Sequence, residues 1–258
     1  MSHLLVKQRL DELYLFCNSR QWVHPDPLEF LYRYPDLEDR EVAGFIAASL
    51  AYGRVAQILK SVSGVLDALG PSPSTLLASA SDRFLQDAFS EFRHRFTSGD
   101  EMVLFLQGIR RVVLCYGSLG ACFRKMYQTR DDTVLQALTA FVNELALPFG
   151  DRAHSLLARP QKGSACKRLN LFLRWMVRED NVDPGGWHWV PRSKLIIPLD
   201  THMHRIAMVL GFTESRCASM ATAIHITQAF REFAPDDPVR YDFALTRTGI
   251  RQDIPGFC

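Results

Sequence analysis

Several features that would assign a chain to the membrane, secreted or metal-binding classes are missing from this sequence. No run of about 18 apolar residues is present, as a membrane-spanning helix would need. Residues 1–20 carry several charges where a signal peptide needs an apolar core. The cysteines form no C-x-x-C pair for zinc or an iron–sulfur cluster, and they lie far apart at Cys17, Cys115, Cys122, Cys166, Cys217 and Cys258. We therefore expect a cytoplasmic protein with reduced thiols and no bound metal, cofactor or membrane.

Strand patterns are nearly absent as well. Apolar residues recur at helical spacing in almost every segment, so the chain is predicted to be all-α. We expect one long helix capped by Asp39 and broken at Gly70, and a second from Asp100 to Gly117. Further helices are expected over residues 133–147, 164–176, 200–211, 219–233 and 239–248, the last capped by Asp237, with a loop over residues 181–191.

The net charge is small but unevenly distributed. The chain has 30 basic and 28 acidic residues, a formal net charge of +2. Residues 152–194 hold nine basic and three acidic residues, a net charge of +6, which leaves 21 basic and 25 acidic residues, or −4, for the rest. Such a basic segment can attract a phosphate backbone, although a solvated helix face has the same composition.

Two segments carry the most specific pattern in the chain. Residues 160–170 read PQKGSACKRLN, and residues 198–205 read PLDTHMHR. Together they resemble the helix-hairpin-helix DNA glycosylase superfamily, in which a hairpin ending in a lysine is followed by a proline, an apolar residue and Asp-Thr-His at the start of a helix. The resemblance covers roughly residues 40–250. It is nearest to a bacterial branch long without a known function and, in the spacing of lysine and aspartate, to the archaeal 8-oxoguanine glycosylases.

This resemblance implies both a fold and a catalytic pair. The fold would be two-lobed and helical, with residues 40–199 as a central lobe ending in the hairpin, residues 1–39 with 200–258 as a second lobe, and the active cleft between them. Lys167 falls on the family's nucleophilic lysine and Asp200 on its aspartate. The protein would be a monomer that flips a modified base out of double-stranded DNA and excises it.

The chemistry of the two residues fits these roles. Breaking an N-glycosidic bond builds positive charge on the sugar, which a fixed carboxylate stabilises. Asp200 is expected to be a helix N-cap, where backbone N–H groups favour an ionised carboxylate. Lys167 is expected in the first turn of a helix starting near Ser164, where the helix dipole and Arg168 disfavour its charged form, as attack on the sugar requires. An imine, and hence strand-cleaving lyase activity, would follow.

Other residues are expected to contact the DNA. Gly163 and Ser164 would offer backbone N–H groups to a phosphate, with Lys162 and Arg168 beside them, unless this is a plain loop-to-helix turn. For the base pocket or the wedge that fills the gap after flipping, the candidates are Tyr52, Arg54, Trp187, Trp189 and His202. Tyr52 and Arg54 would equally suit an ordinary helix surface, and for one of the two tryptophans a core anchor is the favoured interpretation.

Two other functions compete with this interpretation. The string from Asp200 to His204 also resembles the metal-binding D-x-H-x-H of amidohydrolases, but on a helix His202 and His204 would point apart, and no strands precede the motif. A non-catalytic DNA-binding module on the same scaffold is the second alternative. The substrate is left open between an oxidised purine such as 8-oxoguanine, which implies repair, and a hydroxymethylated or glucosylated cytosine of phage DNA, which implies defence.

Overall fold

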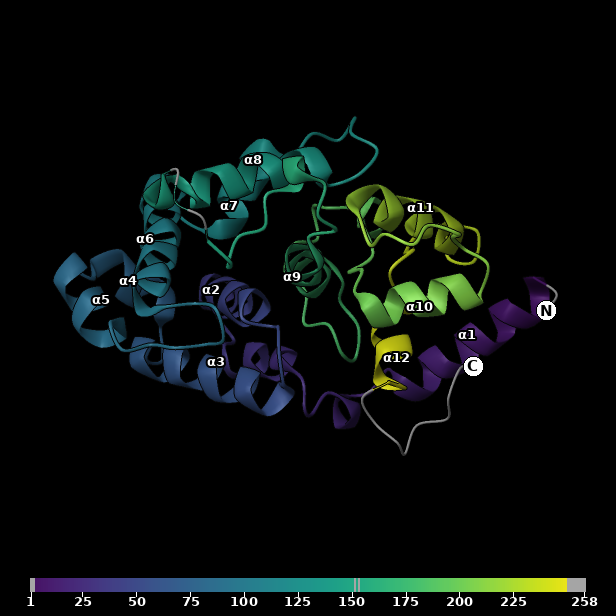
Figure 1. The fold of residues 1–258 in the computed structure, drawn as a ribbon, viewed down its shortest axis with the longest axis horizontal. Coiled ribbons are helices and arrows are strands. Elements are labelled where there is room, and N and C mark those ends of the chain that lie inside the picture. The colour runs from purple at the N-terminus through teal and green to yellow at the C-terminus, as the bar shows by residue number, and fades with distance from the viewer. Residues whose placement is uncertain (1–2, 151, 153, 250–258) are drawn as a thin grey trace. The chain divides into compact units, whose positions relative to one another are not determined.

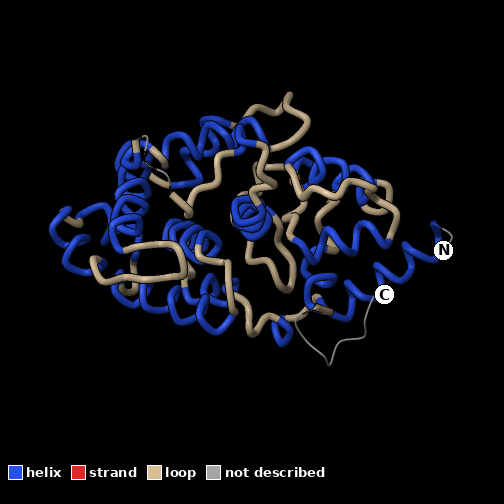
Figure 2. Tube along the Cα trace, in the orientation of Figure 1, coloured by secondary structure: helices blue, strands red, loops and turns tan. Residues whose placement is uncertain are grey.

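The computed structural model describes residues 3–150, 152 and 154–249. Within these residues all regular secondary structure is helical, and pairing of extended segments is limited to isolated bridges (Figure 2), which confirms the all-α prediction. The α-helices are α1 (His3–Cys17), α2 (Leu37–Ser49), α3 (Val55–Leu69), α4 (Pro73–Ser79), α5 (Asp82–Phe89), α6 (Gly99–Tyr116), α7 (Leu119–Met126), α8 (Leu135–Leu145), α9 (Lys167–Val177), α10 (Thr201–Val209), α11 (Met220–Arg231) and α12 (Asp242–Arg247). Short 3-10 helices cover Arg20–Trp22, Pro27–Arg33, Leu147–Phe149, Pro160–Lys162 and Arg192–Lys194.

The chain divides into two compact units. Unit 1 comprises residues 1–24, 132–134 and 160–258, and unit 2 comprises residues 25–131 and 135–159. These boundaries differ from those expected at residues 39/40 and 199/200. Residues 160–199 belong with the C-terminal helices because α9 and the loop after it are joined to the region of α12 by buried ion pairs.

Unit 2 is organised around α2, in which every side chain from Glu41 to Ser49 is buried. The Phe45 ring stacks on Phe105 of α6, with centroids 5.4 Å apart, and meets Phe141 of α8 edge-on at 5.8 Å. The Glu41 carboxylate accepts a hydrogen bond of 2.8 Å from the backbone N–H of Gly120, near the start of α7. Aromatic packing and one buried polar bond thus hold α6, α7 and α8 around α2 (Figure 1).

The long helix expected from Asp39 is two helices, α2 and α3. The break contains Gly53, whose φ of +102° lies outside the helical region. The N-cap of α2 is Asp36 and not Asp39. The Asp39 carboxylate instead accepts hydrogen bonds of 2.8 and 2.6 Å from the backbone N–H and hydroxyl of Ser74. Likewise, α6 is capped by Ser98 in a capping box with Glu101, and not by Asp100, although Gly117 ends it as predicted.

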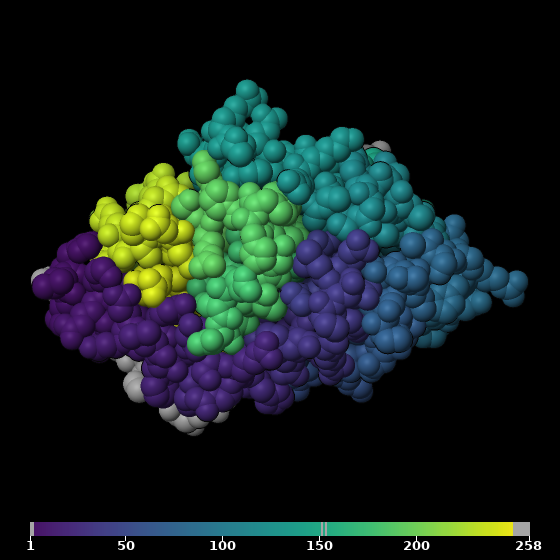
Figure 3. All heavy atoms as spheres, turned by 180° about the vertical axis from the view of Figure 1, so that it is seen from behind, coloured from purple at the N-terminus to yellow at the C-terminus, as the bar shows by residue number. Residues whose placement is uncertain are grey.

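Unit 1 combines the N-terminal helix α1 with α9, α10, α11 and α12. Figure 3 shows the N-terminal segment (purple) beside the C-terminal helices (yellow) on one face, and α1 packs against α12. The predicted cap Asp200 of α10 is confirmed, and Ser219, where the next helix was expected to start, is the residue that caps α11. The predicted cap Asp237 is wrong, because its carboxylate binds the Arg178 guanidinium at 3.0 Å and the helix, α12, begins only at Asp242.

No single helix in the described part of the chain is both long and apolar enough to cross a membrane. Helices α6 and α7 reach that length and composition only as a pair, which is bent by 71° between them.

Candidate functional site

Lys167 and Asp200 lie together in unit 1, although 33 positions separate them in the sequence. Lys167 is the first residue of α9 and Asp200 the residue before α10. The Lys167 Nζ is 3.4 Å from the Asp200 Oδ2, and about a third of each side chain is exposed, 33% for Lys167 and 31% for Asp200. The pair is therefore held in contact while both groups stay accessible to a ligand.

The two oxygens of Asp200 have different partners. Oδ1 accepts hydrogen bonds from the backbone N–H groups of His202 at 3.0 Å and Met203 at 2.8 Å, as an N-cap does. Oδ2 faces the Lys167 ammonium. The cap thus fixes the carboxylate at the N-terminus of α10 through Oδ1, and Oδ2 stays available to the Lys167 amine.

The position of Lys167 is set by the residues before it. The helix starts at Lys167, three residues later than expected, because Cys166 adopts the left-handed conformation with φ 48° and ψ 40°. The Asn170 side chain, buried one turn into α9, donates a hydrogen bond of 3.1 Å to the carbonyl of Ala165. This bond ties the approaching loop to the helix and positions the lysine at its first residue.

The hairpin before Lys167 has no free amide at Gly163. The Gly163 N–H donates to the carbonyl of Pro160 at 3.0 Å, and the Gly163 carbonyl accepts from Met220 of α11 at 3.0 Å. The expectation that this N–H is available to a phosphate is therefore wrong, because the turn of residues 160–163 uses it. Ser164 and Lys162 are exposed and Arg168 is half-buried, so a role for these three in backbone binding stays a prediction.

His202 joins the start of α10 to the end of α12. Arg205 donates a hydrogen bond of 3.2 Å to the His202 Nδ1, and the opposite ring nitrogen lies 3.4 Å from the Leu245 carbonyl. Since a guanidinium only donates, Nδ1 is the acceptor in this contact and Nε2 faces the carbonyl. A Cβ at Gly249 would lie 2.4 Å from the ring. His202 is therefore enclosed on the α12 side, and its predicted place in a base pocket is not tested.

A buried ion network beneath the site was not foreseen from the sequence. Arg174, two turns along α9 from Lys167, donates to Asp183 at 2.9 Å and to Asp242 of α12 at 2.5 Å. Arg178 pairs with Asp183 and with Asp180, the latter at 2.8 Å. Burial opposes the charge of Arg178, but the surrounding aspartates outweigh it and raise its pKa. The network fixes α9, the following loop and α12 as one support for the pair.

Asp242 is a member of this network whose pKa is affected by the charges of the candidate site. Burial raises the pKa of Asp242 and Arg174 lowers it, and the charges of Asp200 and Lys167 also act on it. Its second oxygen, Oδ1, is buried without a hydrogen-bond partner among the described residues. A buried carboxylate thus interacts electrostatically with the Lys167–Asp200 pair. Its position in the sequence, at the start of a short helix, carries no signal of this interaction.

The family of the chain follows from a match over most of its length. The family described as "Protein of unknown function (DUF2400)" matches residues 26–251. The chain belongs to this family. The match contains Lys167, Asp200 and the network beneath them. No curated protein and no solved structure matches the chain.

The two tryptophans of the loop after α9 differ in exposure. Trp187 is fully buried, meets Phe172 edge-on at 5.4 Å and stacks on Trp189 at 5.6 Å. It therefore anchors the loop to the core, as expected for one of the two tryptophans, and its alternative contact with a base is excluded by its burial. Trp189 is half-buried, so a base contact there stays a prediction.

The two candidates in unit 2 also have different environments. The Tyr52 hydroxyl lies 2.6 Å from the Thr97 hydroxyl and 3.0 Å from the His94 carbonyl. Both residues lie in the break between α2 and α3, within the stretch expected to be one continuous helix, and Arg54 is the exposed N-cap position of α3. The hydroxyl of Tyr52 is therefore engaged inside unit 2, whereas Arg54 faces solvent.

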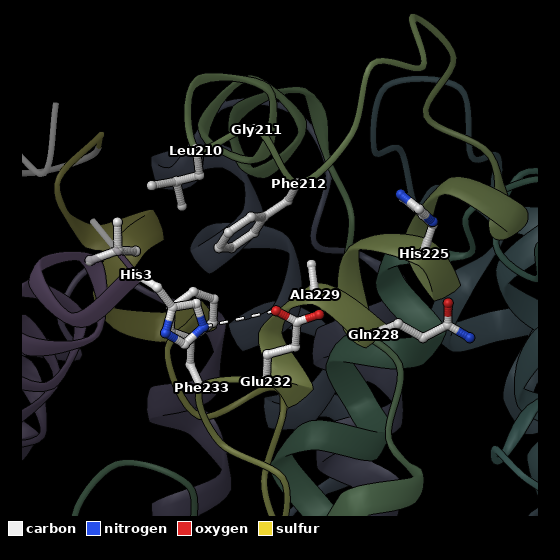
Figure 4. A pocket seen from close by; sticks show the side chains of 10 residues that line it. His3, Leu210, Gly211, Phe212, His225, Gln228, Ala229, Glu232 and Phe233 are labelled. Atoms are coloured by element: carbon white, nitrogen blue, oxygen red, sulfur yellow. Dashed lines mark ion pairs between the residues drawn. The ribbon is translucent and has the colours of Figure 1, made fainter. Parts of the chain in front are cut away.

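The two histidines of the Asp200–His204 string and a pocket in unit 1 both lie apart from the Lys167–Asp200 contact. As expected for residues two positions apart on a helix, His202 and His204 point apart: the His202 ring faces the Leu245 carbonyl, and the His204 Nε2 lies 2.7 Å from the Ser215 carbonyl. The part of the chain that is described contains no group of three or more metal-ligating side chains. A pocket of about 510 Å³ lies between α1, α10 and α11 (Figure 4), lined by residues that include His3, Phe212 and Phe233, and it contains neither Lys167 nor Asp200.

Proposed function

We propose that this protein is a DNA glycosylase that excises a modified base and works by lysine chemistry on the sugar. The observation that carries the proposal is the 3.4 Å contact between the Lys167 amine and the free oxygen of a carboxylate held as a helix cap. The match of both segments to the helix-hairpin-helix glycosylase pattern supports it, as does the all-helical architecture.

The roles of the two groups follow from the charges that develop in the reaction. As the bond to the base breaks, its electron pair leaves with the base, which takes up a proton, and positive charge grows on the sugar carbon. Asp200 stabilises that charge through Oδ2. Lys167, after losing a proton, supplies the electron pair for the new bond to the same carbon. The nitrogen then loses one of its two protons, and its electron pair expels the ring oxygen, which takes up a proton, so that the sugar ring opens and a protonated imine forms, from which the strand is cleaved.

The substrate is proposed as double-stranded DNA with the modified nucleotide turned out of the stack. The two base classes are an oxidised purine such as 8-oxoguanine and a hydroxymethylated or glucosylated cytosine. The half-buried face of Trp189 would suit stacking on either a base or a sugar ring. Repair and defence against phage are the corresponding roles.

The test is base release from duplexes that each carry one of these modifications. Strand cleavage is read before and after alkali, so that glycosylase and lyase steps are scored separately. Wild type is expected to release one base class and to form a covalent DNA adduct with borohydride, whereas Lys167→Gln forms none. Release of neither class by wild type would refute the proposal. Release without an adduct would refute only the imine role of Lys167.

A matched control exists in the same unit. Lys7 forms an ion pair with Asp11 at 2.6 Å, and its side chain is 42% exposed, close to the exposure of Lys167. Lys7→Gln therefore removes an equivalent charge and ion pair away from the site, and it is expected to retain both base release and the adduct. DNA binding that persists with no base release in wild type would favour the non-catalytic module.

A further inference from the structure

A tight turn in unit 2, between α5 and α6, holds its tip in an unusual conformation. His94 and Thr97 form an antiparallel bridge, with backbone hydrogen bonds of 3.1 and 2.9 Å. Arg95, between them, has a φ of 53°, in the left-handed region that residues other than glycine seldom occupy. Such backbone strain persists only where surrounding contacts impose it, and it is common at binding sites.

The contacts that impose this conformation come from buried polar groups. His94 and Thr97 are each 1% exposed. The two ring nitrogens of His94 lie 2.9 Å from the Ser61 hydroxyl and 3.0 Å from the Tyr52 carbonyl, and the Thr97 hydroxyl lies 2.8 Å from that of Ser155. The base of the turn is therefore fixed to unit 2 on several sides, so little conformational entropy remains for its tip to lose on binding.

The tip presents an exposed aromatic ring among arginines. Phe96 is 76% exposed, and the Arg95 guanidinium lies over its ring at 5.2 Å. Arg93 and Arg95 are exposed, as is Arg54. Arg54 is next to the turn in space because a Cβ on its neighbour Gly53 would lie 2.6 Å from the Arg95 side chain. A rigid turn thus offers one apolar ring with the Arg95 guanidinium over it, and two further exposed arginines belong to the turn and to the segment packed against it.

This combination favours a nucleic acid over other partners. An aromatic face stacks on any base, and arginines beside it can contact the phosphates on either side of that base. We propose that the turn of residues 93–97 inserts Phe96 into the base stack of DNA while Arg54, Arg93 and Arg95 contact the flanking phosphates. The inference rests on the proposed function for its partner, DNA.

The test measures binding alone. The probe is a fluorescein-labelled duplex with one tetrahydrofuran abasic analogue, which leaves a gap in the stack and cannot form an imine. Phe96→Ala is expected to weaken binding about 5- to 150-fold, which corresponds to the ~1–3 kcal/mol measured for stacking on one base. Phe96→Trp is expected to restore it. The control is Phe84→Ala, which removes an aromatic ring of unit 2 that is 38% exposed on α5.

The arginines are tested through salt dependence. Arg54→Gln, Arg93→Gln and Arg95→Gly are each expected to lower the slope of log affinity against log salt by about 1. Glycine is chosen at position 95 because it accepts the positive φ, so the turn is retained while the charge is lost. Thermal unfolding of each variant checks that unit 2 remains folded.

The outcomes separate this inference from the proposed function. Weaker binding by Phe96→Ala, with no base release from any duplex, would support the turn and refute the glycosylase. Base release with unchanged binding by Phe96→Ala, or an equal loss in Phe84→Ala, would overturn the role of Phe96 alone. No binding of DNA by wild type, or binding only to vesicles of anionic lipid, would overturn both.

Discussion

Replacing Asp200 by asparagine separates its structural role from its proposed catalytic one. Asparagine is as good an N-cap as aspartate, so Asp200→Asn retains an oxygen for the N–H groups of His202 and Met203. It removes the negative charge that faces Lys167. Asp200→Ala removes both the cap and the charge. The pair of variants therefore distinguishes the two functions of one side chain.

The expected magnitudes follow from the geometry. The ion pair with Lys167 is one-third exposed on both sides, 33% and 31%, so its loss costs at most about 1 kcal/mol of the free energy of unfolding. Loss of the cap in Asp200→Ala costs about a further 1 kcal/mol. Removal of one fixed charge from a reaction centre, by contrast, lowers turnover about 100- to 1,000-fold. Asp200→Asn is thus expected to be nearly as stable as wild type and almost inactive.

Urea unfolding and base release, measured on the same preparations, test this expectation. Asp36 is the matched control, since its Oδ1 caps α2 by accepting from two backbone N–H groups at 3.0 and 3.4 Å. Asp36→Ala is expected to lose stability comparable to the loss of a cap while releasing base at the wild-type rate. An Asp200→Asn enzyme as active as wild type would refute the electrostatic role, and one as unstable as Asp200→Ala would refute the cap argument.

Two further predictions concern the interior. Asp183→Asn removes the fully buried carboxylate shared by Arg174 and Arg178, so we expect a loss of about 3–5 kcal/mol in urea unfolding, and an unchanged midpoint would contradict the network. In a Cys258→Ser variant, two thiols, Cys115 and Cys217, are exposed and are expected to react with a thiol reagent in the folded protein. The other three are buried, and burial raises the pKa of these thiols to about 11 or 12, so they are expected to stay unreactive even at mildly alkaline pH until the chain unfolds. More than two fast thiols would contradict this burial.

The helical class was predictable from the sequence because helix periodicity is a local property. The same holds for signals that act within one turn, such as the cap at Asp200 and the stop at Gly117. The pairing of Lys167 with Asp200 was predictable only through resemblance to a family motif. Spacing alone does not bring together two helix starts 33 positions apart.

Elsewhere, partners distant in sequence determined what each residue does. Asp39 and Asp237 are of the residue type that caps helices, but Ser74 and Arg178 bind their carboxylates. Helices α2 and α12 therefore start at other residues. Trp187 resembles a ligand-stacking residue in the sequence but is buried in the core, whereas the exposed Phe96 carries no local signal. The long-range hydrogen bonds and ion pairs formed on folding select among the local options of each side chain, and the sequence pattern contains no measure of those contacts.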